Sequence, residues 1–305
     1  AELFRRDYLG QGQFGEAGID YPYLFLAPSN TGIPSGLDLT GDGRTDGPGD
    51  AWGFGQYPGQ YGMLVLSMHP IDMDAVRTFQ QFRWKDLPDA KEVQDPETGA
   101  PWYPPSTWEQ LRLSSKSHWD VPIDTPLGRI HLLAAHPTPP AFDGPERRNA
   151  HRNHDEIRFW AEYVAPGARD WIVDDAGRRG GLPDGDLFVI AGDLNADPAD
   201  GNSLPAAIHQ LLEHPRVLRY ATPASEGAVV SAATRGGANP QHRGNPAHDT
   251  GEFSLRVGNL RADYVLPSVG LQVVDSGVFW PLPDTPEHAL TQASDHHMVW
   301  VDVIR

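Results

Sequence analysis

Seven short apolar runs, separated by turn-forming residues, constrain the fold of this 305-residue chain more than any other feature of its sequence. Each run is four to six residues long, rich in β-branched or aromatic residues, and bounded by Gly, Pro or Asp. Such runs are typical of buried strands. The predicted strands are Tyr23–Ala27, Gly62–Ser67, Ile130–Ala135, Leu187–Ala191, Asp263–Leu266, Leu271–Val274 and Met298–Val303.

One segment between the strands carries the i, i+3, i+4, i+7 spacing of a helix with one apolar face. Its apolar positions are Ile157, Trp160, Ala161 and Val164. A second helix is predicted over Leu204–Glu213, where Ser203 is available as the N-cap residue. A further helix opens the chain over Ala1–Tyr8. The sequence therefore predicts a chain of mixed α and β structure.

Long segments rich in Gly and Pro connect these elements. We predict loops at Ser29–Gly59, Trp84–Pro126 and Ala224–Thr250. Loops of this length in a compact domain are usually functional surface or disorder. No segment repeats at a fixed period and no linker separates two cores, so residues 1–305 are expected to form a single domain with long loop insertions.

The charge and composition of the chain exclude some functions. With 41 acidic and 24 basic residues, the formal net charge of −17 opposes tight, sequence-independent binding to nucleic acid. The absence of cysteine rules out thiol catalysis, Cys-based zinc sites and disulfides. No apolar run approaches the roughly 20 residues that a membrane span needs.

The cellular location is suggested only by composition. A Cys-free chain rich in Gly and Pro fits a bacterial protein exported to the periplasm or the medium, and the cytoplasm stays open as an alternative. The first residues lack the charged-then-apolar pattern of a signal peptide, and the chain does not begin with Met. We therefore expect a processed or trimmed N-terminus.

The segment Leu187–Pro198 contains the most informative motif. An apolar strand ends at Gly192 and then presents Asp193 and Asn195 on the same side of the backbone. A carboxylate and an amide held side by side at a strand end can activate a water molecule and hold a phosphoryl oxygen. The alternative is a turn in which both side chains bond to the backbone.

Three further segments carry polar residues beside predicted strands. Asp295 and His296 precede the last strand, where a carboxylate suits a hard cation and an imidazole can accept a proton. The adjacent His297 is expected to be a surface residue. Asp263 opens a strand and could orient a histidine, as the third member of a triad does. His136 ends an apolar strand, and taken alone such a residue is more often structural than catalytic.

Together, these motifs resemble the endonuclease/exonuclease/phosphatase family, which includes deoxyribonuclease I, apurinic endonucleases, sphingomyelinases and inositol-polyphosphate phosphatases. The resemblance rests on His136, Gly192–Asn195, Arg261–Tyr264 and Ser294–His296, in this order. Tyr61–Ser67, followed by Pro70 and Ile71, also resembles a strand of the family, so the similarity runs from about Tyr57 to the C-terminus. It implies an α+β fold, a four-layer α/β/β/α sandwich of two packed, mostly antiparallel sheets flanked by helices.

The resemblance also implies a divalent-metal-dependent phosphoesterase that acts by in-line attack of water on phosphorus. Asp193 would position or deprotonate the water, and Asn195 would hold a phosphate oxygen. His296, oriented by Asp263, would act as general base or contact the attacked phosphate. The choice of base between Asp193 and His296 stays open. His136 would hydrogen-bond the phosphate or assist the leaving group.

The catalytic metal site is where the chain departs from the family pattern. Asp295 would contribute to a Mg²⁺ or Mn²⁺ site. Family members, however, begin with a strand ending in Asn and a second strand ending in a metal-binding Glu, and neither is visible here. Glu2 lies in a predicted helix and Glu16 in a Gly-rich loop. We therefore expect an N-terminally incomplete domain, a weak or absent catalytic cation, and an N-terminal segment or separate chain that completes the sheet.

A second ion site is predicted in the acidic loop that begins at Asp38. Oxygen-bearing side chains alternate around Gly43, as in the calcium loops of EF-hand and dockerin type. The candidate ligands for a structural Ca²⁺ are Asp38, Asp42, Asp46 and Asp50. The pattern lacks a Glu at the twelfth position and has no flanking helices, so a solvated acidic loop is the alternative.

The sequence leaves open whether the substrate is nucleic acid or a small molecule or lipid headgroup, and whether it is a diester or a monoester. A nuclease would use exposed basic residues, although ion pairs on a helix face explain them as well. The candidates are Arg147, Arg148, Arg152 and Arg158. A lipid or small-molecule enzyme would use exposed loop aromatics, which packing beneath a loop explains equally. The candidates are Trp102, Tyr103, Trp108 and Trp119. The alternative to an enzyme is a non-catalytic or impaired binding protein that retains the fold.

Overall fold

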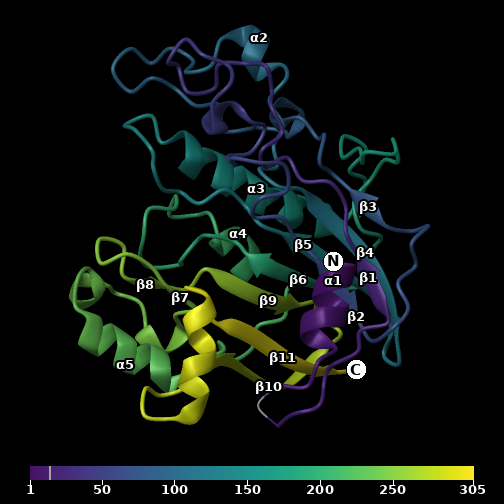
Figure 1. The fold of residues 1–305 in the computed structure, drawn as a ribbon. Helices are drawn as coiled ribbons and strands as arrows, with labels where there is room; N and C mark the ends of the chain where they lie inside the picture. The colour runs from purple at the N-terminus through teal and green to yellow at the C-terminus, as the bar shows by residue number, and fades with distance from the viewer. Residues whose placement is uncertain (14) are drawn as a thin grey trace.

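The computed structural model describes residues 1–13 and 15–305, and a five-stranded sheet lies at its centre (Figure 1). Its strands, in spatial order, are β3 (Arg77–Thr78), β4 (His118–Thr125), β5 (Gly128–Ala135), β6 (Leu187–Asp193) and β9 (Asp263–Pro267). Neighbouring strands run antiparallel except β5 and β6, which are parallel. The last residues of β5 and β6 and the first residue of β9 therefore meet at one end of the sheet.

Helices cover one face of this sheet. On that face the side chains of Leu133, Phe188 and Ile190 are completely buried, because they pack into one apolar core with α3 (Arg148–Val164). The four positions that predicted this helix face the core as expected, so α3 is confirmed. Short helical turns complete the layer: α2 (Pro105–Trp108), α4 (His209–Leu212) and the 3-10 turn Trp84–Asp86. The 3-10 turns Asn239–Gln241 and Pro246–His248 instead pack on α5 (Glu226–Arg235).

A second layer of strands packs on the opposite face. It contains the pair β1 (Tyr23–Phe25) and β2 (Val65–Ser67) and the pair β10 (Gln272–Phe279) and β11 (Met298–Ile304). Phe25 and Val65 pack against Trp119 and Val121 of β4, and Val303 packs near Ile130. A small pair, β7 (Gly251–Glu252) and β8 (Asn259–Leu260), lies beside the C-terminal strands.

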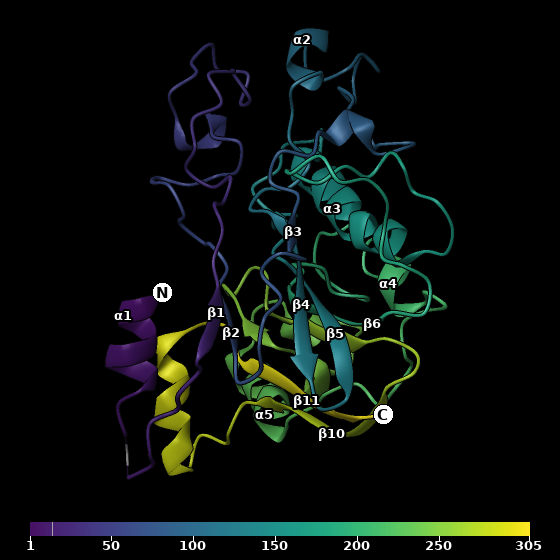
Figure 2. The same ribbon diagram turned by 90° about the vertical axis from the view of Figure 1, so that its right-hand side faces the viewer.

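Helical segments lie outside the second layer. They are α1 (Glu2–Phe4), the π-helical turn Arg5–Leu9 and the 3-10 helix Pro286–Ala293, while α5 (Glu226–Arg235) packs on β10 and β11. Figure 2 shows the layers in order from left to right: α1 with the 3-10 helix, the β1–β2 pair, the five-stranded sheet, and α3 with α4. The structure thus confirms a mixed α/β fold in which packed, mostly antiparallel sheets lie between helices.

The second layer covers the five-stranded sheet incompletely. Leu132, Val189 and Val265 point to this side from three adjacent strands and are only half-buried. Their neighbours Phe188 and Leu266, which point to the helices, are fully buried. Among the described strands, the β1–β2 and β10–β11 pairs belong to separate sheets and are not hydrogen-bonded to each other. An apolar stripe therefore remains partly open between them.

All seven predicted strands are confirmed, with shifts of a few residues at their ends. The predicted loop Trp84–Pro126 is wrong where it contains β4 and the short helices Trp84–Asp86 and α2. This strand alternates the buried apolar Trp119 and Val121 with the polar His118 and Asp120, and it includes a proline, which weakens the strand pattern. Beyond β3, the segment around Ile71 pairs with this edge of β4. There the carbonyl of Pro122 accepts the N–H of Asp72 and the donor from β4 is Asp124, so Pro122 needs no N–H of its own.

One loop prediction and one helix prediction also need correction. The predicted loop Ala224–Thr250 contains α5, whose N-cap Ser225 accepts a hydrogen bond from the backbone N–H of Ala228. The predicted helix Leu204–Glu213 is wrong over its first half, since only His209–Leu212 is α-helical and Ile208 is its N-cap. Ser203 instead donates to the carbonyl of Asp197 at 3.4 Å.

The helices of the described residues include none with both the length and the apolar character needed to cross a bilayer.

His118, at the start of β4, is a buried histidine held in its neutral form. Its Nε2–H donates to the carbonyl of Glu156 at 2.8 Å, and its Nδ1 accepts from the hydroxyl of Ser114 at 2.6 Å. The rings of Phe159 and Trp160 pack around it. Burial lowers the pKa of His118 to about 4, against the weaker opposing effect of the Glu156 carbonyl.

Because the folded chain disfavours the protonated ring, the stability that His118 contributes is complete above about pH 6.5 and is lost as the pH falls toward 4. Replacing His118 by Gln removes this titration. Between pH 7 and pH 4.5 we expect the variant to lose about 2 kcal/mol less unfolding free energy than the wild type, measured by urea denaturation. Replacing the exposed His69 by Gln should leave the pH dependence unchanged, and parallel curves for all three proteins would contradict the assignment.

Candidate active site

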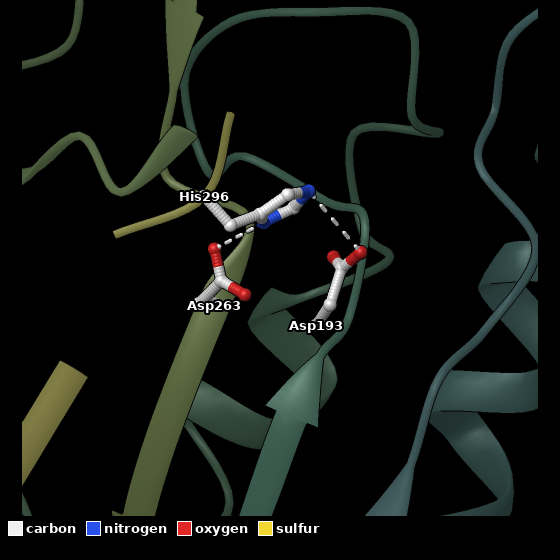
Figure 3. Close-up of side chains that lie close together, drawn as sticks. All are labelled: Asp193, Asp263 and His296. Atoms are coloured by element: carbon white, nitrogen blue, oxygen red, sulfur yellow. Dashed lines mark hydrogen bonds and ion pairs between the residues drawn. The ribbon is translucent and has the colours of Figure 1, made fainter. Parts of the chain in front are cut away.

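Three strand ends bring one histidine between two aspartates. Asp193 ends β6, Asp263 begins β9, and their backbones are paired in register. His296 enters from the loop before β11, where the backbone at Gly251 pairs with it. Its Nδ1 lies 2.8 Å from Oδ2 of Asp263, and its Nε2 lies 3.8 Å from Oδ2 of Asp193 (Figure 3).

His136 joins this group from the neighbouring parallel strand. It directly follows β5, and its Nε2 lies 3.2 Å from Oδ2 of Asp193. The approach of the two strands depends on Gly192, whose φ is +149° and where a Cβ would lie 2.0 Å from the carbonyl oxygen of Ala135. A side chain at this position would therefore separate His136 from Asp193.

Asn195 forms a tight turn with Asp193. Its backbone is left-handed, with φ +52°, and its N–H donates to Oδ1 of Asp193 at 2.9 Å. Its side-chain amide donates to Oδ2 of Asp193 and to the carbonyl of Pro137, both at 3.1 Å. The turn alternative is therefore present, and the same turn places both side chains on the wall of a cavity.

Thr250 anchors Asp263 and was missed from the sequence. This buried hydroxyl donates to Oδ2 of Asp263 at 2.7 Å and accepts the backbone N–H groups of Ala262 and Asp263, each at 3.0 Å. The carbonyl of Thr250 accepts the N–H of His297, which fixes the loop that carries His296. No sequence pattern marks a threonine at the end of a long loop, so only the structure reveals this role.

The pKa values of His296 and Asp193 shift in opposite directions, and burial raises the pKa of Asp263. The hydrogen bond to Asp263 raises the pKa of His296 to about 9, despite partial burial, and the charges of Asp263, Asp193 and Asp295 act in the same direction. Burial opposes ionisation of Asp193, but His136 and His296 outweigh it and lower the pKa of this carboxyl. At neutral pH the site therefore holds a cationic His296 beside an ionised Asp193.

A cavity of about 1070 Å³ opens beside this group. Of the predicted site residues, the structure brings six to its wall: His136, Asp193, Asn195, Asp263, Asp295 and His296. Asp295 is exposed and its carboxylate has no hydrogen-bond donor among the described residues, whereas Asp193 and Asp263 already accept hydrogen bonds. The six residues that the sequence motifs singled out therefore lie together on one cavity wall.

Lys116 also lies on this wall and was missed from the sequence. Only 4% of it is exposed, and its Nζ makes one long hydrogen bond, 3.4 Å to the carbonyl of Pro137. Burial lowers its pKa to about 8, although the nearby charges of Glu156 and Asp193 act in the opposite direction. A buried ammonium group with unused donors beside a cavity suits an anionic ligand.

The carboxylate oxygens at this site are the type of ligand atom that a hard divalent cation prefers, but there are few of them. Within the described chain, one group of three His, Asp or Glu residues has its ligand atoms within 4.8 Å of one another: Asp193, Asp263 and His296. Mg²⁺ prefers oxygen ligands, and here one nitrogen and one carboxylate are occupied by each other. Asp295 adds a free carboxylate on the same wall.

The predicted calcium ligands are arranged differently. Asp38 accepts the N–H groups of Gly41 and Gly43, Asp46 pairs with Arg44, and the buried Asp50 accepts the N–H of Leu39. The four aspartates Asp38, Asp42, Asp46 and Asp50 are not among the described groups whose ligand atoms converge. Calcium binding by this loop stays a prediction.

Other candidate residues have mainly packing roles. The expectation for His297 is wrong, because its buried ring stacks on Trp280 at 3.6 Å instead of lying at the surface. Trp119 is fully buried against Phe25, which confirms the packing alternative for this aromatic. The guanidinium groups of all four candidate arginines donate to backbone carbonyls. They are Arg147, Arg148, Arg152 and Arg158.

Comparisons with known proteins identify the family that this chain matches. The model of the Endonuclease/Exonuclease/phosphatase family matches residues 7–296, and thus begins well before Tyr57, where the resemblance was expected to start. No curated protein matches the chain.

Several solved structures are similar at low identity. An endonuclease/exonuclease/phosphatase from Beutenbergia cavernae DSM 12333 is 16% identical, with a TM-score of 0.49, over 99% of this chain and 55% of that chain. The 3′ phosphatase NExo from Neisseria, bound to a product DNA hairpin, is 15% identical, with a TM-score of 0.38, over 79% and 74%. A beta toxin mutant from Staphylococcus aureus with bound magnesium ions is 12% identical, with a TM-score of 0.32, over 78% and 63%. The chain thus spans about half the length of the Beutenbergia protein.

The geometry predicts that Asp263 controls the proton affinity of His296. Replacing Asp263 by Asn removes the carboxylate that stabilises the protonated ring, so the pKa of His296 should move from about 9 most of the way to its ordinary value of about 6.5. An NMR titration of the histidine ring protons in metal-free buffer measures this, with His296→Gln to assign the signal. Asp302→Asn, an exposed change on β11, should have no effect, and a pKa that stays near 9 in Asp263→Asn would refute the role of this pair.

Proposed function

Because this chain belongs to the endonuclease/exonuclease/phosphatase family, whose members are metal-dependent phosphoesterases, we propose that it hydrolyses a phosphate ester by in-line attack of water. The observation that carries the proposal is the group Asp193–His296–Asp263, with His136 beside it, on the wall of one cavity. Acidic and cationic groups alternate there within a few ångströms, as proton transfer and phosphate binding require.

The charges of the two central groups suggest a division of labour. Asp193, held ionised, accepts the proton of the attacking water, while the water oxygen forms a bond to phosphorus. His296, held protonated by Asp263, donates its Nε2–H to a non-bridging phosphate oxygen. The bond from phosphorus to the ester oxygen breaks as the new bond forms. His136, whose Nε2 lies 3.2 Å from Asp193, would donate a hydrogen bond to a second non-bridging oxygen, and the departing alkoxide would take its proton from solvent water.

A divalent cation belongs to the proposal. Asp295 would hold Mg²⁺ or Mn²⁺, because it offers a free carboxylate on the cavity wall. When bound, the cation neutralises charge on the non-bridging oxygens. Asn195 would hold the adjacent phosphate oxygen once its amide turns from Pro137 toward the substrate.

We also propose that another segment completes the second layer. The half-buried Leu132, Val189 and Val265 form an apolar stripe that runs toward the site, between strand pairs that are not bonded to each other. An extended segment, N-terminal on the same polypeptide or on a separate chain, would bury this stripe. It would also be able to bring a second carboxylate to the strand ends, beside Asp295.

The enzyme proposal is tested with bis(p-nitrophenyl) phosphate at millimolar Mg²⁺, Mn²⁺ or Ca²⁺, and with chelator. We expect turnover that depends on the metal and that falls about 100-fold or more in kcat/KM for Asp193→Asn and for His296→Asn, since both would take part in proton transfer or charge stabilisation. His69→Asn, an exposed histidine outside the cavity, is the matched control. Absence of metal-dependent turnover in the wild type would favour the alternative, a binding protein that retains the fold.

The metal proposal is tested by calorimetric titration of the chain with Mg²⁺. With one free carboxylate, we expect a Kd weaker than about 1 mM, and no measurable binding to Asp295→Asn. Asp302→Asn, which removes an exposed carboxylate on β11, should behave as the wild type. Micromolar binding would show that the described residues already form a complete site, and would remove the need for a completing segment.

A further inference from the structure

The cavity beside the candidate active site has a polar end and a much larger apolar part. Its polar end holds Lys116, His136, Asp193 and His296, and its volume of about 1070 Å³ exceeds what a phosphate group alone would fill. Resting on the proposed function, we propose that this cavity takes a compact phosphoester that carries an aromatic or aliphatic group. The phosphate would lie against Lys116 and His136, and the apolar group would extend toward Phe54 and Tyr61.

At the polar end of the cavity, the ammonium of Lys116 has hydrogen-bond donors that no described residue accepts. Lys116 is only 4% exposed, yet its ammonium makes a single hydrogen bond of 3.4 Å and pairs with no carboxylate within the described residues. His136 and His296 add ring nitrogens to the same wall. A buried cation without a full set of acceptors is costly unless a ligand supplies them, and the oxygens of a phosphate monoanion or dianion would do so.

Buried apolar side chains form the floor of the cavity. Leu39, Trp84, Tyr103 and Leu111 line it and are themselves almost fully buried. They come from loops that pack with α3 in the main core. The floor is therefore a fixed part of the folded structure. Such a surface binds methylene groups or rings, and it offers few partners for a hydrated polar group.

Three exposed aromatic residues form the rim of the cavity. Phe54 is 57% exposed, Tyr61 52% and Phe142 95%, and all three line the cavity. Tyr61 and Phe142 also have left-handed backbones, with φ of +60° and +58°, which bulky residues rarely adopt. Exposed aromatics held on strained backbone around one cavity suit the binding of an apolar ligand better than they suit stability.

A polymeric nucleic acid fits this cavity less well than a compact molecule. Recognition of a polynucleotide needs several exposed cations for successive phosphates. The basic residues on the wall are Lys116, Arg148 and Arg152. Lys116 is buried, and the two arginines donate to backbone carbonyls, including that of Leu39. The net charge of −17 opposes a polyanion further.

The test measures binding without turnover, so that its outcome is separate from that of the enzyme proposal. Inorganic phosphate, methyl phosphate, butyl phosphate and phenyl phosphate share one anionic group and differ in apolar size. Titrated calorimetrically into the chain in metal-free buffer with chelator, phenyl phosphate should bind at least about 10-fold more tightly than methyl phosphate, with butyl phosphate between them. Equal affinities across the series would overturn the proposal. So would a failure of the three esters to bind at concentrations up to 10-fold above the inorganic phosphate concentration that saturates the polar end.

Variants separate the two ends of the cavity. The double variant Phe54→Ala/Tyr61→Ala should reduce the preference for phenyl over methyl phosphate to less than about 3-fold, because it removes the aromatic rim. Tyr57→Ala is the matched control, since Tyr57 is equally exposed on the same loop but does not line the cavity. Lys116→Met should weaken all four ligands by a similar factor and keep their order. Tighter binding of a 5′-phosphorylated oligonucleotide than of phenyl phosphate would instead favour a polymeric substrate.

Discussion

The register between β6 and β9 is the constraint on which the rest of the site depends. It places Asp193 opposite Asp263 at one end of the sheet, and the parallel pairing of β5 with β6 brings His136 to the same end. His296 can then reach both aspartates from a single loop. A one-residue slip of either strand would turn one aspartate to the opposite face, into the apolar core around α3.

The electrostatics of the site follow from this geometry. Two carboxyls placed close together would repel, and burial would favour their neutral forms. A histidine between them offsets these effects at Asp193, because its positive charge is stabilised by Asp263 and in turn stabilises the ionised Asp193, whereas burial still raises the pKa of Asp263. The charge pattern is therefore present before any ligand binds. This preorganisation is consistent with membership of a family of phosphoesterases, in which fixed groups stabilise charge on phosphorus-bound oxygens.

The sequence predicted those features that depend on short-range patterns or on motifs. All seven strands, the helix α3 and the residues that converge at the cavity could be identified, because apolar runs and motif order are local signals. β4 could not, since Asp120 and His118 interrupt its apolar residues, and their partners include distant residues such as Tyr163 and Glu156. Thr250 and Lys116 were missed for the same reason: their roles arise from tertiary neighbours and leave no spacing in the chain.

The open stripe on the second face of the sheet has a thermodynamic consequence. Any molecule that covers Leu132, Val189 and Val265 binds the folded chain and not the unfolded one, so by linkage its concentration raises the melting temperature. Covering this stripe also reaches the strand ends where the aspartates lie. The stability of the fold and the chemistry of the site are therefore coupled through one surface. An agent that occupies this surface would change both.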